Sequence, residues 1–495
     1  MKPTSEQQSF VDADSQKVKL VAWAGTGKTS AMVARAQAKP ERTLYLAFNK
    51  SVAEEAKGRF PITVTSKTQH SLAYGAIIGR SAKYTLGKLS IFKTSRYFKV
   101  DYYLASLVHK TLECWCNSAD EVITVDHAAP DLIERYNDDM KPVEVDMAKK
   151  LWTLILDARS PDFPMTHGGY LKLYQLSKPR LAYDVIMLDE AQDTNPVTQD
   201  IVMRQAQNGS RLFLAGDPYQ QIYAWRGAVD ALQKIEADPF YLTQSFRFGP
   251  EVAGVANSLL RTFFGETRPL VGLGAAGAIV EELPKPPYTY LSRTNAHLFA
   301  YATVLAGKFK LYTPGANGVG NLPLFDSVMN VYHLWKGNKF EVRDPELKMF
   351  QDYWELKDFV ETGNADAEHV VSVAIVDKYQ DQVPAQVEKV RQSLVPQSSM
   401  ADITLSTAHR AKGLEWDNVI LCEDFPTLYD EETGHLKPIG YGDRQKMLAP
   451  DEVNLLYVAV TRAKRNLKLN KELERFLRSP DAVPVPVVPS VSPTS

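Results

Sequence analysis

The sequence predicts an α/β fold with parallel sheets. Near its start, residues 18–23 and 43–48 are apolar runs typical of buried strands, and residues 29–38 between them have a helical pattern. Strand, helix and strand at this spacing form the βαβ unit of a parallel sheet. The same rhythm returns in two later regions, at residues 183–188 and 211–215 and at residues 419–422 and 454–469.

Length and composition are those of a large globular protein. The 495 residues suffice for about three to four domain-sized units, and 44% of them are hydrophobic. A formal net charge of −2 excludes a basic coat, so a nucleic-acid site would have to be a local groove. The cysteines are too few for a disulfide framework, and no run of about 18 apolar residues could cross a membrane. Since the start also lacks a signal-peptide pattern, we expect a soluble, intracellular protein, cytoplasmic if its source is prokaryotic or viral.

Two segments interrupt the α/β rhythm with mostly helical patterns, and we interpret both as insertions. The first insertion spans residues 76–165 and the second spans residues 316–395. The remainder divides into two α/β domains, formed by residues 1–75 with 166–243 and by residues 244–315 with 396–478. Residues 479–495 hold five prolines and cannot bury a core, so we expect a disordered tail.

A glycine-rich loop follows the first predicted strand and opens the first predicted helix. Gly25 and Gly27 let backbone N–H groups close around phosphate oxygens, and the helix N-terminus adds positive potential. Lys28 would reach the β- and γ-phosphates, and the Thr29 hydroxyl would ligate Mg²⁺. Ala22 stands where the general Walker A pattern has its first glycine. The loop therefore predicts binding of ATP with Mg²⁺ through Ala24, Gly25, Thr26, Gly27, Lys28 and Thr29.

An acidic run, residues 189–193, follows the apolar strand at residues 185–188. Carboxylates at the C-terminal end of a parallel strand face the crevice where ligands bind. Asp189 is placed to hold Mg²⁺ through water, and Glu190 to accept a proton from the attacking water. Alone, the run could be a solvated loop, but paired with Lys28 it predicts a site of nucleotide hydrolysis.

Residues 216–228, together with residues 189–193, resemble the UvrD/Rep branch of superfamily 1 helicases. The resemblance implies two RecA-like P-loop domains, each carrying a largely helical insertion. Further matches follow in the family's order at Gln7 and at residues 68–71, 245–247, 407–415 and 457–463.

Flanking segments resemble one group of this family, the F-box DNA helicases. These segments are residues 47–51, 170–173 and 454–457. No F-box precedes Gln7, so we expect no ubiquitin-ligase role.

The resemblance implies individual roles at the nucleotide. Gln7 would contact the adenine edge, Phe246 would stack on the adenine ring, and Glu415 would accept a hydrogen bond from the ribose. Gln220, Arg247 and Arg462 would contact the γ-phosphate. Guanidinium groups from a second domain neutralise charge on the transferring phosphoryl group, and they close the cleft when ATP is present.

Binding a single strand without sequence preference needs aromatic faces and phosphate donors. By resemblance, Tyr223 and Trp225 would stack on bases, although either could instead belong to a core. His70 and His409 fall where the family contacts the strand. Gln69 replaces the aromatic residue that the family usually has before the histidine at the position of His70, which puts one stacking platform in doubt.

Two features of the first insertion have alternative interpretations. Basic and aromatic residues alternate over residues 80–99, which suits a nucleic-acid face or a solvated helix face. His109, Cys114, Cys116 and His127 invite a zinc interpretation, but their spacing is not a standard structural zinc pattern, so we expect no zinc.

The resulting hypothesis is an ATP-dependent translocase or helicase of 3′→5′ polarity that unwinds DNA or displaces proteins during DNA repair or recombination. Its substrate would be single-stranded DNA or a duplex with a single-stranded tail, with no membrane involved. A protein partner could bind the insertions or the tail. Residues 430–435 could form a wedge-like hairpin, whereas residues 471–477 are plain helix. The alternative is an ATP-gated DNA-binding subunit that switches a partner enzyme.

Overall fold

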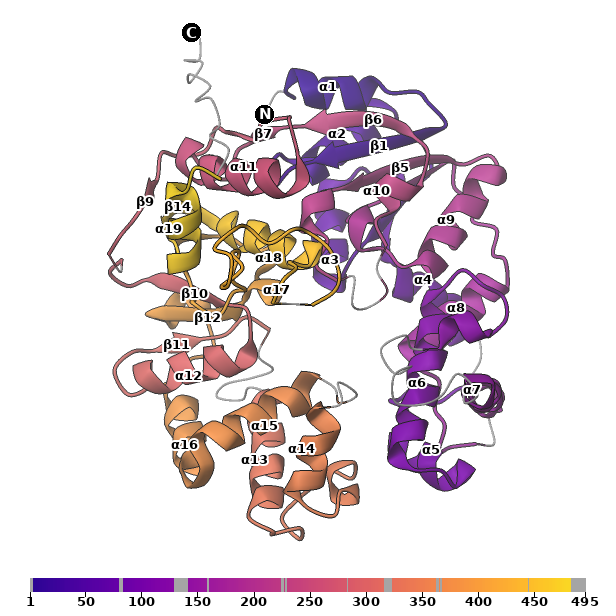
Figure 1. Cartoon of the computed structure of the whole chain (residues 1–495). Coiled ribbons are helices and arrows are strands. Elements are labelled where there is room, and N and C mark those ends of the chain that lie inside the picture. The colour runs from indigo at the N-terminus through magenta and orange to yellow at the C-terminus, as the bar shows by residue number, and fades with distance from the viewer. Residues whose placement is uncertain are drawn as a thin grey trace.

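Two α/β domains lie side by side in the computed structural model, and each extends into a helical lobe on the same side of the molecule (Figure 1). The structure describes residues 3–79, 83–128, 141–157, 160–223, 227, 229–282, 284–315, 323–361, 365, 367–443 and 445–481. Within these ranges, no helix is long and apolar enough to cross a membrane. The predicted α/β class with parallel sheets is confirmed.

The first domain is built on a six-stranded parallel sheet in the order β3-β2-β4-β5-β1-β6. Its central strands are buried apolar runs, as expected for a sheet covered by helices on both faces. The strands are β1 (Lys17–Ala22), β2 (Thr43–Ala47), β3 (Val64–Thr68), β4 (Val185–Leu188), β5 (Arg211–Gly216) and β6 (Asp238–Leu242). The helices are α1 (Ser5–Asp12), α2 (Lys28–Ala38), α3 (Lys50–Arg59), α4 (Gln69–Ile77), α8 (His167–Leu176), α9 (Pro196–Gln207) and α10 (Ala231–Lys234).

The second domain has a sheet of the same kind in the order β11-β12-β10-β13-β14-β9. Its strands are β9 (Ala278–Ile279), β10 (Tyr288–Ser292), β11 (Leu311–Tyr312), β12 (Ile403–Thr407), β13 (Trp416–Leu421) and β14 (Ala463–Lys468). Its helices are α11 (Pro250–Phe264), α12 (Asn295–Leu305), α17 (Ala408–Ala411), α18 (Pro450–Val460) and α19 (Lys471–Arg478). A separate small pair joins β7 (Gln244–Ser245) to β8 (Val271–Gly272).

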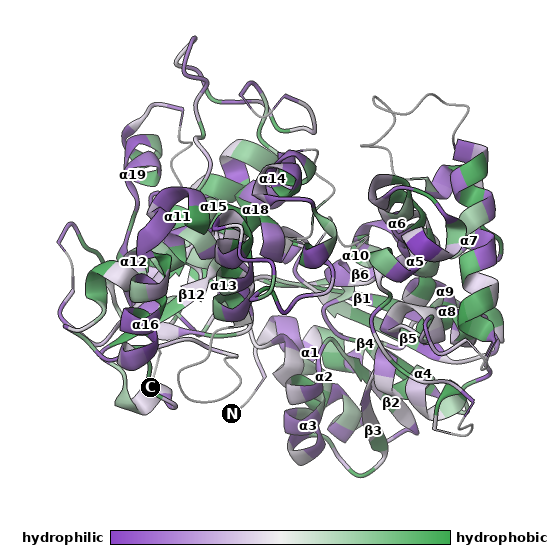
Figure 2. Cartoon of the chain, turned by 90° about the horizontal axis from the view of Figure 1, so that it is seen from below, coloured by the Kyte–Doolittle hydropathy of each residue, from purple (hydrophilic) through white to green (hydrophobic). Residues whose placement is uncertain are grey.

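The first insertion is a helical lobe that shares its core with α4, α8 and α9 of the first domain. Its helices are α5 (Ile91–Phe98), α6 (Tyr102–Asn117) and α7 (Lys141–Leu156). Hydrophobic and hydrophilic residues alternate around α7 (Figure 2), so one face of the helix packs on the lobe core and the other meets solvent.

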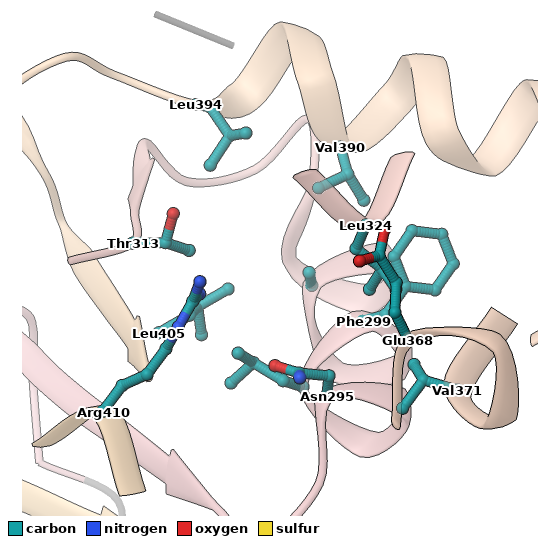
Figure 3. A pocket seen from close by; sticks show the side chains of 12 residues that line it. Asn295, Phe299, Thr313, Leu324, Glu368, Val371, Val390, Leu394, Leu405 and Arg410 are labelled. Carbon is teal, nitrogen blue, oxygen red and sulfur yellow. The ribbon is translucent and has the colours of Figure 1, made fainter. Parts of the chain in front are cut away.

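The second insertion is also helical, and it packs on the second domain. Its helices are α13 (Pro323–Trp335), α14 (Tyr353–Glu361), α15 (Ala367–Tyr379) and α16 (Val383–Ser393). A cavity of about 220 Å³ separates this lobe from α12 and β12. Arg410, which lies on α17, extends into the cavity, and Glu368 of α15 lies on the opposite wall (Figure 3).

Contacts join the two halves of the molecule at both levels. Between the domains, one apolar core includes Trp23 and Ala24 of the first domain together with Phe248 and Leu455 of the second. Between the lobes, the ring of Tyr102 lies 5.3 Å from that of Phe350 and 5.1 Å from that of Phe359, centroid to centroid. The Tyr102 hydroxyl also donates to Glu346 Oε2 at 3.4 Å.

Candidate nucleotide site and nucleic-acid contacts

The turn between β1 and α2 is the glycine-rich loop. Neighbouring side chains pack so closely against Gly25 and Gly27 that neither position could carry a side chain. Gly25 and Gly27 have φ angles of 75° and 79°, in the left-handed region that favours glycine. A Cβ atom on Gly25 would lie 2.4 Å from Ser245 Oγ and 2.7 Å from Arg247 Cβ. One on Gly27 would lie 2.9 Å from Gln7 Nε2. The loop is therefore a bare backbone cradle of the kind that holds phosphate.

Lys28 begins α2 and meets the acidic run at the end of β4. Its ammonium lies 3.1 Å from Asp189 Oδ1 and also pairs with Glu190. Burial lowers the pKa of Lys28, but the two carboxylates outweigh burial and raise it above its ordinary value. The Tyr45 hydroxyl donates to Asp189 Oδ2 at 2.5 Å. The structure thus brings together the lysine and the two carboxylates that the sequence predicts for hydrolysis.

Glu190, the predicted general base, is ionised and is held by its neighbours. Burial raises its pKa, but Lys28 and then Lys412 outweigh burial and lower it well below the usual range, so the carboxylate is ionised at neutral pH. Its φ angle of 52° is unusual for a residue with a side chain and lies in the left-handed region. Such backbone strain clusters at functional sites. The Gln192 amide donates to Glu190 Oε2 at 2.5 Å and fixes the carboxylate from its other side.

Lys412 is a site residue that the sequence predictions missed. It follows α17 in the second domain, yet its ammonium donates to the carbonyl of Gln220 at 2.7 Å and pairs with Asp193, both in the first domain. It also lies 3.6 Å from Glu190 Oε2. Burial raises the pKa of Asp193 to about 6, although Lys412 opposes this rise. Lys412 stands inside the motif at residues 407–415, so its place in that motif was the available signal.

The segment after β7 reaches the phosphate loop from the second domain. The Phe246 N–H donates to the Gly25 carbonyl at 3.0 Å, and the Phe246 ring is 41% exposed beside the loop. Arg247 Nε donates to Glu415 Oε2 at 2.7 Å. Gln7 lies on the other side of the loop, where its amide donates to the Thr26 carbonyl at 3.2 Å. Gln7, Phe246 and Arg247 therefore lie around one loop, and Glu415 is joined to them through Arg247.

Arg462, which the resemblance predicts to contact the γ-phosphate, is buried in the second domain. It is 1% exposed, and its guanidinium donates to Val458 O at 2.9 Å, to Leu414 O at 3.1 Å and to Thr461 Oγ1 at 3.1 Å. All three acceptors belong to the second domain, because the side chain turns back along the end of α18. Burial lowers the pKa of Arg462 to about 9. Arg462 therefore hydrogen-bonds within the second domain, and its contact with the γ-phosphate stays a prediction.

Tyr223 and His409, two predicted DNA contacts, come together across the two domains. The Tyr223 ring stacks on Phe48 with centroids 5.6 Å apart and planes 18° apart, and its hydroxyl donates to the His409 carbonyl at 3.3 Å. Tyr223 also packs against the interdomain core, so the alternative core role has structural support. Trp225, the other predicted stacking residue, lies outside the described residues.

His70, the remaining predicted DNA contact, is part of an aromatic cluster. Its ring meets those of His167 and Tyr170 edge-on, at 6.2 Å and 6.0 Å. Burial lowers the pKa of His70, and His167 lowers it further. Gln69 is held by the first domain, because its amide oxygen accepts from Thr198 Oγ1 at 2.7 Å.

The histidines of the first insertion have other partners, and its cysteines are free thiols. His109 Nε2 is hydrogen-bonded to Thr94 Oγ1 at 2.7 Å, and His127 Nε2 lies 3.0 Å from Asp120 Oδ2. Across the described ranges, no group of three or more His, Cys, Asp or Glu side chains is placed to hold a metal ion. In the basic and aromatic stretch, Arg96 lies over the Phe92 ring at 5.4 Å.

Comparison with known proteins matches both halves of the chain. Residues 126–238 match the UvrD/REP helicase N-terminal domain, and residues 385–473 match the UvrD-like helicase C-terminal domain. The chain is 35% identical to F-box DNA helicase 1 of Gallus gallus, over 96% of this chain and 50% of that protein. It is 31% identical to F-box DNA helicase protein 1 of Schizosaccharomyces pombe, over 96% of this chain and 58% of that protein.

A bacterial relative is matched over more of its own length. A probable DNA helicase of Mycoplasma pneumoniae is 23% identical over 94% of this chain and 82% of that protein. By contrast, the chain spans only about half the length of the two F-box relatives.

Proposed function

Because this chain belongs to the UvrD-like helicase family, we propose that it is an ATP-driven motor that moves along single-stranded DNA in the 3′→5′ direction. The observation that carries the proposal is the composition of the nucleotide site. Lys28 and Glu190 come from the first domain. From the second domain, Lys412 reaches Glu190 and Arg247 reaches the phosphate loop. A site shared in this way couples hydrolysis to relative movement of the two domains.

ATP would lie on the Gly25–Gly27 cradle, and Thr29 and Asp189 would hold its Mg²⁺, which neutralises charge on the phosphates. The residues of the chain fit the phosphates of ATP, since Gly25 and Gly27 leave the backbone of the loop bare and a Cβ at either would clash with a neighbouring side chain. Glu190 would accept the proton of the attacking water because it is ionised and held between Lys28 and Gln192. Lys28, Gln220 and Arg247 would hold the γ-phosphate in place.

DNA would cross both domains on the side of Tyr223 and His409. These residues belong to different domains and are linked by a hydrogen bond, so a change at the cleft would alter both together. A strand held by aromatic faces and moved by a two-domain cleft would be unwound from its complement or cleared of bound proteins. We place this activity in DNA repair or recombination, where single-stranded DNA is an intermediate.

The test measures the ATPase rate against the length of single-stranded DNA, for the natural chain and for Glu190→Gln. A translocating motor gives a rate that rises with length and then saturates, and Glu190→Gln reduces the rate by about 100-fold or more. Glu236→Gln, at an exposed position of the first domain, serves as the control and should keep the natural rate.

Other outcomes of this experiment have separate meanings. A rate that is independent of DNA length would favour the ATP-gated regulatory subunit over a motor. If DNA gave no stimulation, the DNA contacts assigned above would be wrong. Polarity is measured with duplexes that carry either a 3′ or a 5′ single-stranded tail, and unwinding from the 5′ tail alone would contradict the 3′→5′ direction.

A further inference from the structure

One buried hydroxyl of the second domain bonds to two parts of the nucleotide site in the first. Tyr457 lies on α18 and is 0% exposed. Its oxygen accepts a hydrogen bond from the Ala24 N–H in the phosphate loop at 3.0 Å, and its O–H donates to Asp217 Oδ2 at 3.0 Å. Ala24 and Asp217 follow β1 and β5, which are neighbours in the first sheet. The hydroxyl therefore joins α18 to the ends of both strands.

Asp217 also holds Gln220, which is predicted to contact the γ-phosphate. The Gln220 amide donates to Asp217 Oδ2 at 2.8 Å, the same oxygen that accepts from Tyr457. The Tyr219 N–H donates to Asp217 Oδ1 at 3.1 Å. Because one carboxylate holds both Gln220 and Tyr457, a displacement of α18 also displaces the acceptor that orients Gln220.

A second branch leads from Asp217 to the predicted base. The Asp217 N–H donates to Gln192 Oε1 at 3.1 Å, and the other end of this amide donates to Glu190 Oε2 at 2.5 Å. Gly216 leaves the space for Gln192, since a Cβ there would lie 2.2 Å from Gln192 Oε1. The path from Tyr457 to the half-buried Glu190 thus consists of hydrogen bonds through the buried Asp217 and Gln192 and one short stretch of backbone.

Burial raises the free-energy cost of losing any of these hydrogen bonds. Asp217 is 2% exposed, and burial raises its pKa to about 6. A buried carboxylate needs several donors, and removing one leaves the group undersatisfied. Burial also raises the pKa of Tyr457 well above its ordinary value, so the hydroxyl keeps its proton and remains a donor at neutral pH.

We propose that Tyr457 is a positioning residue, whose hydroxyl lets α18 of the second domain set Gln220 and Glu190 for ATP hydrolysis. This inference rests on the proposed function and deepens it. Movement of the second domain shifts the hydroxyl, the shift alters the donors around Asp217, and Asp217 in turn alters Gln220 and Glu190. The domain that moves on DNA thereby gates the chemistry in the other domain.

The test compares Tyr457→Phe with the natural chain in ATPase assays at saturating single-stranded DNA. Phenylalanine keeps the ring, which packs edge-on against Tyr219 with centroids 6.3 Å apart, and removes only the hydroxyl. We expect kcat to fall about tenfold and the KM for ATP to stay within about twofold, because the variant loses the hydrogen bond to Asp217 that orients catalytic groups as well as the one from the Ala24 N–H.

Tyr429→Phe is the matched control. Tyr429 is also buried in the second domain, but its hydroxyl has no hydrogen-bond partner among the described residues. Its loss should leave kcat at the natural value. Thermal unfolding of both variants shows whether either has lost its fold.

Asp217→Ala tests the path without changing the tyrosine. It removes the acceptor for the Tyr457 hydroxyl, so the double variant should be no more than about twofold slower than the slower single variant. Fully multiplicative effects would contradict a shared path, and so would a kcat for Tyr457→Phe equal to the natural one. A rise in the KM for ATP that matches the loss of kcat/KM would assign Tyr457 to nucleotide binding alone. If the natural chain itself lacked DNA-stimulated turnover, the proposed function would fail first.

Discussion

Gly25 is the residue at which the two domains come into contact over the phosphate loop. Its positive φ angle excludes most side chains, and the atoms facing it belong to Ser245 and Arg247 of the second domain. The first constraint is local to the turn, whereas the second depends on how closely the cleft can close. These two constraints can be separated by mutation.

We predict that Gly25→Ala abolishes DNA-stimulated ATP turnover, with a fall of at least about 100-fold. The new methyl group would overlap Ser245 Oγ and Arg247 Cβ and hold the domains apart. Initial ATPase rates at saturating ATP and DNA give the measurement. Gly209→Ala is the control, because Gly209 also has a positive φ angle, 99°, but a Cβ there meets nothing within 4 Å.

The control should lose stability by about 1–2 kcal/mol, the cost of the left-handed conformation, and keep its turnover. Equal rates for Gly25→Ala and the natural chain would show that the cleft does not need this close approach.

Individual site residues were predictable where a local pattern names them. Lys28 and Glu190 follow strands and stand in short motifs, so spacing alone assigns their chemistry. Tyr457 and Asp217 have no such pattern for their bond, because 240 residues separate them and only the packing of α18 brings them together. Arg462 stands at a motif position that predicts a phosphate contact, and the motif does not reveal that its guanidinium donates to Val458 O and Leu414 O of its own domain.

At the scale of elements, an ion pair connects the short helix after β4 to the residue that follows helix α17. The former, η4 (Ala191–Asp193), ends in a buried carboxylate, and Lys412 follows α17 and pairs with it. Burial raises the pKa of Asp193 to about 6, although Lys412 opposes the rise. Glu190 stays ionised at that pH because Lys28 and Lys412 overcome its burial and hold its pKa low.

We predict that ATP turnover falls as the pH drops through about 6. Protonation of Asp193 removes its ion pair with Lys412 and weakens the link between the domains, while Glu190 keeps its charge. The measurement is kcat from pH 5 to pH 8 at saturating ATP and DNA. Asp193→Asn, which is neutral at every pH, should show the reduced rate throughout. If that variant kept the acidic limb, Asp217, whose pKa burial also raises to about 6, would be the group that titrates.

The same shift affects stability in the opposite direction. The folded pKa of Asp193, about 6, lies above the ordinary value of 3.8. The folded state therefore binds this proton more tightly than the unfolded state. Its contribution to stability is fully present below pH 3.8 and is lost as the pH rises through about 6.

Most elements were predictable from the sequence, but the order of the strands within each sheet was not. Apolar runs marked β1, β2, β4 and β5 within about one or two residues. The two-residue strand β9 carries no periodic signal, and residues 454–469 contain the end of a helix followed by a strand. The position of β10 between β12 and β13 also follows from no local pattern, since both neighbours come after the second insertion.

At the scale of the whole molecule, the two insertions meet through Tyr102. Its ring contacts Phe350 and Phe359, and its hydroxyl reaches Glu346. Since Tyr102 begins α6 and the other three residues belong to the second insertion, this side chain bridges lobes that the two domains carry separately.

We predict that Tyr102→Ala lets the two lobes separate. The substitution removes two aromatic contacts, worth about 0.5–1.5 kcal/mol each. Small-angle X-ray scattering should then show a larger maximum dimension than for the natural chain. Tyr97→Ala is the control, because Tyr97 is 56% exposed and its ring contacts are to Phe98 and Phe163 of its own lobe. Identical scattering from all three proteins would mean that other contacts hold the lobes together.

The strand order of the second domain also constrains how the protein is made. β10 is synthesised more than 100 residues before β12 and β13, the strands that flank it, and β9 waits for β14 near the end of the described chain. As the nascent polypeptide leaves the ribosome, the second insertion can collapse first and bring its two ends together. That early collapse shortens the loop whose closure entropy must be overcome before the sheet can assemble. The second insertion would then act during biosynthesis as an internal folding aid for the domain that carries it.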